Sequence, residues 1–315
     1  MSAIVTVTTR DGTRLDVERH GGSEPSPLRG SADDDAVILC HGIIQNVKAF
    51  AVPSFSAIDL LVSRGFTVYA LNLRGRGGES AHHDLGTYVD EDAAAVVDLV
   101  AARHRSVSWI GHSMGGLIGV SVQRPMHAVV ALASPLLPGD ARLRGLSVDK
   151  ALFKLSRLLA SKARAFPGRQ YAGVFSVLRG AIDRGLPWPL PLWKPGSFDD
   201  DDLLFTLRHA FSSDGHHVLA DLCQLAMENG ERAGRVPVAA RLRALQTPLL
   251  CVAGAVDGIA PADSVHALFS RAGSPVKRYL EVDAGHIDLI TGRRARADVW
   301  EPVIAFLREQ APARP

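Results

Sequence analysis

The chain has 315 residues, 47% of them hydrophobic, which is enough to bury the core of one large domain and an insertion. Its 35 lysines and arginines nearly balance 33 aspartates and glutamates, and the net charge of +2 argues against a nucleic-acid-binding protein. No apolar stretch of the sequence reaches the length needed to cross a bilayer.

The N-terminal segment and the cysteines bear on the cellular compartment. Residues 1–10 alternate in polarity like a strand, without a basic start followed by an apolar signal segment. Cys40 and Cys251 fall within predicted core strands and Cys223 within a predicted helix. This odd set is more typical of buried thiols than of a disulfide framework. We therefore expect a cytoplasmic protein.

Strands and helices alternate along most of the chain. Residues 3–20 are predicted to form an antiparallel hairpin that turns at Asp11-Gly12, and residues 21–35 a flexible connector. Further strands are predicted at 36–40, 66–71, 106–110, 126–132, 247–254 and 277–282, with helices near 55–64, 87–103 and after 115. This alternation predicts an α/β protein with a mostly parallel sheet of about eight strands and helices on both faces.

The segment Gly111-His112-Ser113-Met114-Gly115 lies between a predicted buried strand and a predicted helix. A Gly-x-Ser-x-Gly string can be a simple tight turn. Between a strand and a helix, however, the flanking glycines let the backbone bend sharply enough to lift the serine hydroxyl clear of the sheet. We therefore expect Ser113 to be a catalytic nucleophile.

A serine hydroxyl needs a base to accept its proton and a third group to orient that base. Asp257 follows the strand at 247–254 and His286 follows the strand at 277–282. Both positions lie past the carboxyl ends of strands, where the ligand crevice of an open α/β sheet forms. We predict His286 as the base and Asp257 as its partner, with Asp140, beyond the preceding strand, as the alternative acid.

Three other aspartates compete with Asp257 for the role of the acid. Asp263 falls inside the helix that follows the strand, and Asp283 and Asp288 stand too close in sequence to His286 to orient its ring. They are therefore weaker candidates.

Catalysis by such a serine also needs two donors for the oxyanion of the tetrahedral intermediate. One is the backbone N–H of Met114, the residue after the nucleophile, and the other comes from the loop after the third strand. Gly42 would let that loop bend so that the Ile43 N–H faces the pocket, although His41-Gly42 could also be an ordinary turn.

Residues around these groups are candidates for the substrate pocket. They are His41, Gly42, Ile44, His112, Trp188 and Trp193. His216-His217 lack a further partner at metal-ligand spacing, so we expect no metal site and no cofactor.

These segments together resemble the α/β-hydrolase superfamily over roughly residues 35–135 and 245–310. The motifs that carry this resemblance are His41-Gly42-Ile43-Ile44, Gly111 to Gly116, Asp257 and Gly285-His286. His-Gly followed by two aliphatic residues and Gln-Asn is similar to the acid-lipase and esterase branch. Asn72-Leu73-Arg74-Gly75 departs from the Asp-x-Arg-Gly of many members. The resemblance implies the α/β-hydrolase fold, with a core at 1–137 and 242–315.

Between residues 138 and 241 the alternation of strands and helices stops. Amphipathic helices are predicted at 147–165, near 171–183 and near 218–228, and Asp199 to Asp202 resembles a helix start. The resemblance implies that this segment, inserted after strand 6, is a helical cap that shapes the acyl pocket. The apolar loop 185–193, which contains Trp188 and Trp193, is either a core plug or part of a substrate entrance.

Residues 141–180 carry nine lysines and arginines and a single acid. A solvated helix face is the favoured interpretation. The alternative is a patch for peripheral contact with an anionic lipid surface, a phosphate or coenzyme A.

The sequence thus predicts a cofactor-free serine hydrolase that cleaves small-molecule carboxylic esters with an apolar acyl part, through an acyl-serine intermediate. An acyltransferase or thioesterase on the same triad is the first alternative. A non-catalytic ligand-binding protein is the second, because a fold alone does not fix a function, although all three triad positions are filled. The sequence gives no indication of the oligomeric state.

Overall fold

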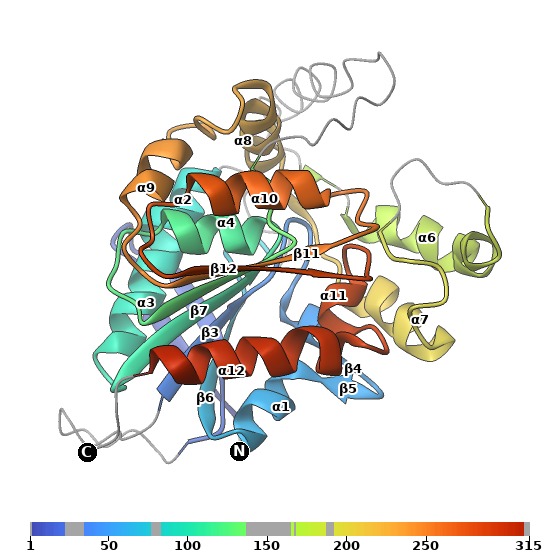
Figure 1. The fold of residues 1–315 in the computed structure, drawn as a ribbon, viewed down its shortest axis with the longest axis horizontal. Helices are drawn as coiled ribbons and strands as arrows, with labels where there is room; N and C mark the ends of the chain where they lie inside the picture. Colours follow the sequence, from blue (N-terminus) through green and yellow to red (C-terminus); the bar gives the residue numbers. More distant parts are fainter. Residues whose placement is uncertain are drawn as a thin grey trace.

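The computed structural model describes residues 2–22, 35–76, 83–136, 165–166, 168–186 and 192–311. In these residues, one eight-stranded sheet has the order β1-β2-β6-β3-β7-β8-β11-β12 (Figure 1). The strands are β1 (Ser2–Thr8), β2 (Arg14–His20), β3 (Asp35–Cys40), β6 (Phe66–Leu71), β7 (Ser106–His112), β8 (Ala128–Leu132), β11 (Leu249–Gly254) and β12 (Lys277–Val282). Two short ribbons pair β4 (Ala51–Val52) with β5 (Phe55–Ser56) and β9 (Ala165–Phe166) with β10 (Asp214–Gly215).

The direction and burial of the strands follow from their side-chain patterns. β2 alternates between exposed or half-exposed and buried residues, and it pairs antiparallel with both β1 and β6. The apolar strands β7 and β8 are buried along their whole length, and the strands from β6 to β12 in the sheet order pair parallel. Continuous apolar runs suit parallel strands because helices cover both faces of such a sheet. The predicted mostly parallel sheet of about eight strands is confirmed.

Helices cover both faces of this sheet. α1 (Ala57–Ser63) and α12 (Glu301–Gln310) lie on one face, and α4 (Met114–Ser121) and α10 (Ala262–Arg271) on the other (Figure 1). The helical region predicted at 87–103 is built from α2 (Leu85–Thr87), a π-helical segment (Tyr88–Ala93) and α3 (Ala94–Ala101). The short α11 (Asp288–Thr291) and a second π-helical segment (Arg296–Trp300) precede α12, and a 3-10 turn (Val47–Phe50) precedes β4.

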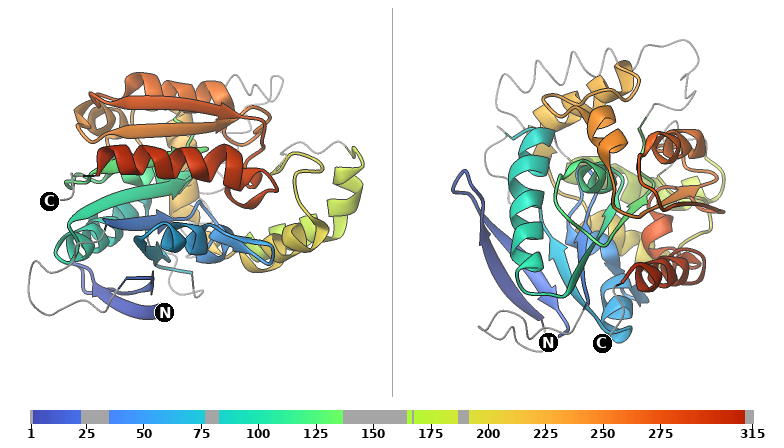
Figure 2. Two further views of the ribbon diagram at one scale, coloured as in Figure 1. Left: turned by 60° about the horizontal axis from the view of Figure 1, so that its bottom comes forward. Right: turned by 60° about the vertical axis from the view of Figure 1, so that its left-hand side comes forward.

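The insertion after β8 adds α6 (Gly168–Asp183), α7 (Asp200–His209), α8 (His216–Met227) and α9 (Val238–Ala244). α6 and α7 project beyond one end of the sheet (Figures 1 and 2). The helices predicted at 171–183 and 218–228 are present, and Asp199 is the N-cap of α7.

Two details of the insertion differ from the prediction. Residues 147–164 lie outside the described residues, and Ala165, placed at the end of that predicted helix, belongs instead to β9, because it pairs with β10. The helix α9 was not predicted, since its seven residues are too few for a clear periodicity.

The strand order indicates where a ligand site is expected. From β3 the chain runs to β6 on one side and then to β7 on the other side of β3. In open α/β sheets, ligands bind outside the carboxyl ends of the strands where the strand order reverses in this way. The loops after β3 and β7 both open at this point, and those after β11 and β12 leave the same edge.

Two further expectations concern composition. All three cysteines, Cys40, Cys223 and Cys251, are free and buried, as their odd number indicated. Within the described ranges, no helix combines the length and the apolar character that crossing a membrane requires.

Candidate active site

Ser113 forms a sharp turn between β7 and α4. Its backbone has φ 53° and ψ −120°, a conformation that L residues rarely adopt, and its N–H donates to the Leu132 carbonyl at 2.7 Å. Such strain costs on the order of 1–3 kcal/mol and persists only where the surroundings enforce it. The turn has no room for flanking side chains, because a Cβ on Gly115 would lie 2.3 Å from the Cys40 carbonyl oxygen.

This close packing makes Gly111→Ala a test of the turn. A Cβ at Gly111 would lie 2.1 Å from the Gly115 carbonyl group, so we expect the free energy of unfolding to fall by about 3 kcal/mol. Gly173→Ala in α6 is the matched control, because its Cβ would meet nothing within 4 Å, and alanine should stabilise that helix by roughly 0.5–1 kcal/mol. Urea denaturation of both variants measures the difference. Equal stability of the two would contradict the described turn.

The structure brings Asp257 and His286 together. His286 Nδ1 lies 2.8 Å from Asp257 Oδ2, and the two side chains are 7% and 0% exposed. The other carboxylate oxygen, Oδ1, accepts the backbone N–H groups of Ile259 and Ala260, both at 2.8 Å. The carboxylate is therefore fixed on one side by the loop after β11 and directs its free oxygen at the imidazole.

Contacts between His286 and His112, the residue before Ser113, place Ser113 near this pair. His112 Nε2 is 3.0 Å from the His286 carbonyl oxygen, and the two imidazole rings have centroids 4.6 Å apart. Gly42 of the loop after β3 is also adjacent, since a Cβ there would lie 3.1 Å from Ser113 Cβ. Among the described residues, no hydrogen bond joins the Ser113 hydroxyl to His286. Catalytic hydrogen bonds are often long until a substrate is bound.

No hydrogen bond from the described part of the chain occupies the N–H groups of the two predicted oxyanion donors. The Gly42 N–H donates to Gln45 Oε1 at 3.0 Å and the Ile44 N–H to Asp214 Oδ2 at 3.2 Å, whereas no hydrogen bond within the described ranges uses the Ile43 N–H between them. Met114 is the first residue of α4, where N–H groups lack intrahelical partners and the helix dipole favours negative charge. Both N–H groups are thus free to bind an oxyanion.

The insertion holds the loop that carries Ile43. Ile44 has φ 52°, and its carbonyl accepts the Ser212 N–H at 2.8 Å while its N–H is bound by Asp214. Burial alone would raise the pKa of Asp214, but the Arg76 guanidinium 2.7 Å away and a hydrogen bond from Tyr88 hold that pKa well below its usual range. An ionised Asp214, 1% exposed, therefore anchors the loop after β3 to the insertion.

Two of the predicted pocket residues, His41 and His112, are buried histidines that contact the loop after β3. Burial, and then the charge of Arg76, lower the pKa of His41 to about 3, and its Nδ1 lies 2.8 Å from the Gly42 carbonyl. Burial also lowers the pKa of His112 well below its usual value, so this ring is neutral beside Gln45 Oε1 at 2.9 Å. Both rings shape the loop after β3.

The other predicted residues lie in or near the insertion. Trp193 is 2% exposed and donates its indole N–H to Asp183 at 2.8 Å. The Trp193 side chain is therefore packed rather than open to solvent, whereas residues 187–191 of the same loop lie outside the described residues. Trp188 and the alternative acid Asp140 lie outside the described residues.

Gln45 and Asp214 were not predicted from the sequence, and Asp288 was considered only as a rival acid. Gln45 stands three residues after Gly42, and its polar side chain in an otherwise apolar loop is a weak signal. Asp214 is 170 residues from its partner Ile44, and no local pattern connects the two.

Comparisons with known proteins concern the family and the fold of the chain. The profile of the "Alpha/beta hydrolase family" matches residues 37–299. A search of curated proteins gives no significant match. Among solved structures, a malate-bound thermophilic esterase from Thermogutta terrifontis has a TM-score of 0.65 at 17% identity, covering 98% of this chain and 100% of its own.

Two further structures are similar to a comparable extent. An esterase from Exiguobacterium antarcticum has a TM-score of 0.63 at 15% identity, with 96% of this chain and 99% of that one covered. A monoacylglycerol lipase from Paleococcus ferrophilus has a TM-score of 0.63 at 18% identity, with 94% and 99% covered. At these identities the likeness concerns the fold.

The sheet topology, the turn at Ser113 and the family profile define the class of this protein. The chain belongs to the alpha/beta hydrolase family, as its resemblance indicated.

Proposed function

We propose that this protein is a serine hydrolase that cleaves carboxylic esters with an apolar acyl part. The observation that carries the proposal is the hydrogen bond between Asp257 and His286, at the carboxyl edge of the sheet and beside the strained turn at Ser113. Strain of this kind concentrates at functional sites. A buried carboxylate–imidazole pair next to a serine on a strained strand-to-helix turn is the arrangement that activates a hydroxyl for acyl transfer.

The reaction proceeds in two halves. Ser113 Oγ attacks the ester carbonyl while His286 accepts the serine proton, and Asp257 stabilises the imidazolium that forms. The N–H groups of Ile43 and Met114 bind the oxyanion. The imidazolium then gives its proton to the leaving alcohol, which leaves an acyl-serine. Water, deprotonated by His286, attacks the acyl-serine and releases the acid.

An ester substrate with an apolar acyl part is supported by two observations. Ile43 and Ile44, both partly buried, lie in the loop whose Gly42 adjoins Ser113. Two of the similar structures are described as esterases and one as a monoacylglycerol lipase. In this proposal, residues 138–241 form the cap that shapes the acyl pocket.

The basic segment 141–180 is described only in part. Arg179 on α6 forms a bidentate ion pair with Asp200 of α7, with N···O distances of 2.8 and 2.7 Å. Arg179 is thus paired with a neighbouring helix, whereas seven of the nine basic residues of the segment lie outside the described residues.

A panel of p-nitrophenyl esters of graded acyl length tests this proposal. We expect release of the free acid, at a rate that depends on acyl length and is unaffected by added alcohols or amines. Formation of a new ester or amide with an added acceptor would instead support the acyltransferase. Turnover of none of the esters, together with binding of the acids, would support a non-catalytic ligand-binding protein.

A further inference from the structure

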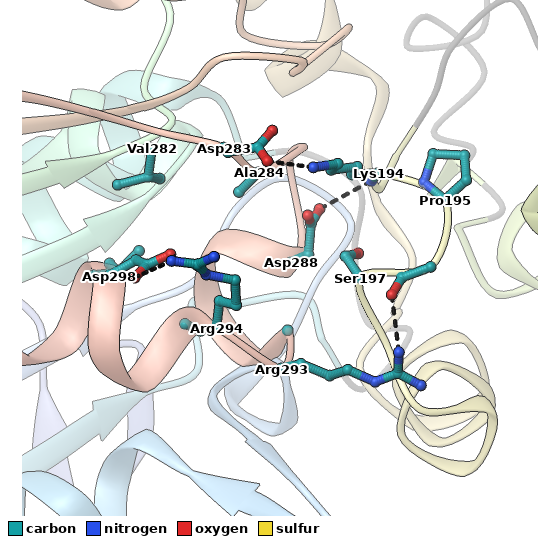
Figure 3. Close-up of a pocket in the computed structure, with 14 residues that line it drawn as sticks. Lys194, Pro195, Ser197, Val282, Asp283, Ala284, Asp288, Arg293, Arg294 and Asp298 are labelled. Atoms are coloured by element: carbon teal, nitrogen blue, oxygen red, sulfur yellow. Dashed lines mark hydrogen bonds and ion pairs between the residues drawn. The ribbon is translucent and has the colours of Figure 1, made fainter.

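The loop that carries His286 is held by a segment of the insertion, Leu192 to Lys194. The Ile287 N–H donates to the Leu192 carbonyl at 2.9 Å. The Lys194 N–H donates to Asp288 Oδ1 at 3.3 Å (Figure 3). The second oxygen of the same carboxylate, Oδ2, accepts the Gly285 N–H at 2.8 Å. Asp288 thus connects the backbone of the insertion to the residue before His286.

These contacts fix the backbone on both sides of His286. The N–H groups of Gly285 and Ile287 are bound, and the carbonyl of His286 itself faces His112. The backbones of the two segments are closely packed, because a Cβ on Gly285 would lie 2.7 Å from the backbone nitrogen of Lys194. A shift of Leu192 to Lys194 must therefore move the loop that carries the imidazole.

The Asp288 side chain is suited to this role. It is 3% exposed and lines one wall of a cavity of about 310 Å³ between the insertion and the end of β12 (Figure 3). A carboxylate can accept a hydrogen bond at each oxygen, whereas a carboxamide has one oxygen and an NH₂ group. In Asp288→Asn, one of the two N–H groups would face another donor and lose its acceptor, at the cost of an unsatisfied buried group.

We propose that Asp288 is a positioning residue that couples residues 192–194 of the insertion to the imidazole of His286. The inference rests on the proposed function, because it assumes that His286 is the base. The Asp288 carboxylate binds the backbone N–H groups of Lys194 and Gly285 rather than the imidazole itself. It acts through the Gly285 N–H, and the arrangement of the insertion thereby sets the approach of His286 to Ser113.

The test compares Asp288→Asn with Asp283→Asn. Asp283 is the matched control, because it contacts the Lys194 ammonium group at the exposed rim of the same cavity (Figure 3). For Asp288→Asn we expect kcat to fall about ten- to a hundredfold with KM changed by less than about twofold, since small displacements of a catalytic group cost rate rather than binding. Asp283→Asn should keep the wild-type kcat.

A spectroscopic measurement separates positioning from general destabilisation. The His286 Nδ1 proton, hydrogen-bonded to Asp257, should give a downfield proton resonance, assigned by its absence in His286→Ala. We expect this resonance in the wild type and in Asp283→Asn, and its shift or broadening in folded Asp288→Asn. Should Asp288→Asn not fold, Lys194→Pro removes the N–H donor of the insertion together with the ammonium group, whose ion pair Asp283→Asn also removes. Lys194→Pro should produce the same spectral change as Asp288→Asn and a several-fold lower kcat.

The outcomes distinguish the two proposals. An unchanged kcat and an unchanged resonance in Asp288→Asn, or in Lys194→Pro where the former does not fold, would overturn the inference and leave the proposed function standing. A perturbed resonance in a protein whose wild type hydrolyses no ester would refute the proposed function and support the coupling of the insertion to His286.

Discussion

Ser113→Ala is expected to lower kcat for ester hydrolysis by about 10⁶-fold, since removal of a serine nucleophile disables the whole catalytic unit. Alanine keeps the Cβ atom, so the strained turn and the packing of Gly111 and Gly115 stay as they are. The loss should therefore appear without a change in thermal stability. Initial rates with the best ester of the panel, at high enzyme concentration, measure it.

Ser113→Gly serves as the control for the backbone. Glycine adopts φ 53° and ψ −120° without strain, so this variant should be inactive as well and more stable than Ser113→Ala by about 1 kcal/mol. Turnover in Ser113→Ala comparable to that of the wild type would reject Ser113 as the nucleophile. Equal stability of the alanine and glycine variants would reject the strain at this turn.

Asp257→Asn is expected to lower kcat by about 10⁴-fold through the tautomer of His286. Two backbone N–H groups donate to Asp257 Oδ1, so the carboxamide of asparagine must place its oxygen there. Its NH₂ group then faces His286 Nδ1, which can only accept. The proton of the neutral ring moves to Nε2, and the imidazole loses the lone pair that should accept the serine proton.

Asp140→Asn is the discriminating control for this prediction, because Asp140 is the alternative acid. It should retain nearly the wild-type rate. A large loss in Asp140→Asn together with a near-normal rate in Asp257→Asn would show that the acid was misassigned, whatever the distance between Asp257 and His286.

Local sequence patterns predicted most of the fold. The strands at 36–40, 66–71 and 106–110 are apolar runs bounded by polar residues or glycines, and each is a strand of the sheet. The turn at Ser113 was equally predictable from the sequence, because only small residues fit beside it. Asp257 and His286 could be singled out since each follows a strand end, and parallel strands end at one edge.

The contacts that hold the site in place could not be predicted. Asp214 binds the Ile44 N–H across 170 residues, and its ion pair with Arg76 depends on how the insertion folds back onto the core. Asp288 was judged only as a partner for the imidazole ring, whereas it binds the backbone beside His286. Side chains that act on a distant backbone leave no periodicity or spacing in the sequence.

The most direct test of the account is to treat the folded protein with a fluorophosphonate and to locate the adduct by mass spectrometry. A fluorophosphonate reacts with a serine that a neighbouring base activates. We expect a single adduct, on Ser113, formed orders of magnitude more slowly in His286→Ala. If the protein hydrolyses esters but carries no adduct on Ser113, or carries the adduct on another serine, Ser113 is not the nucleophile.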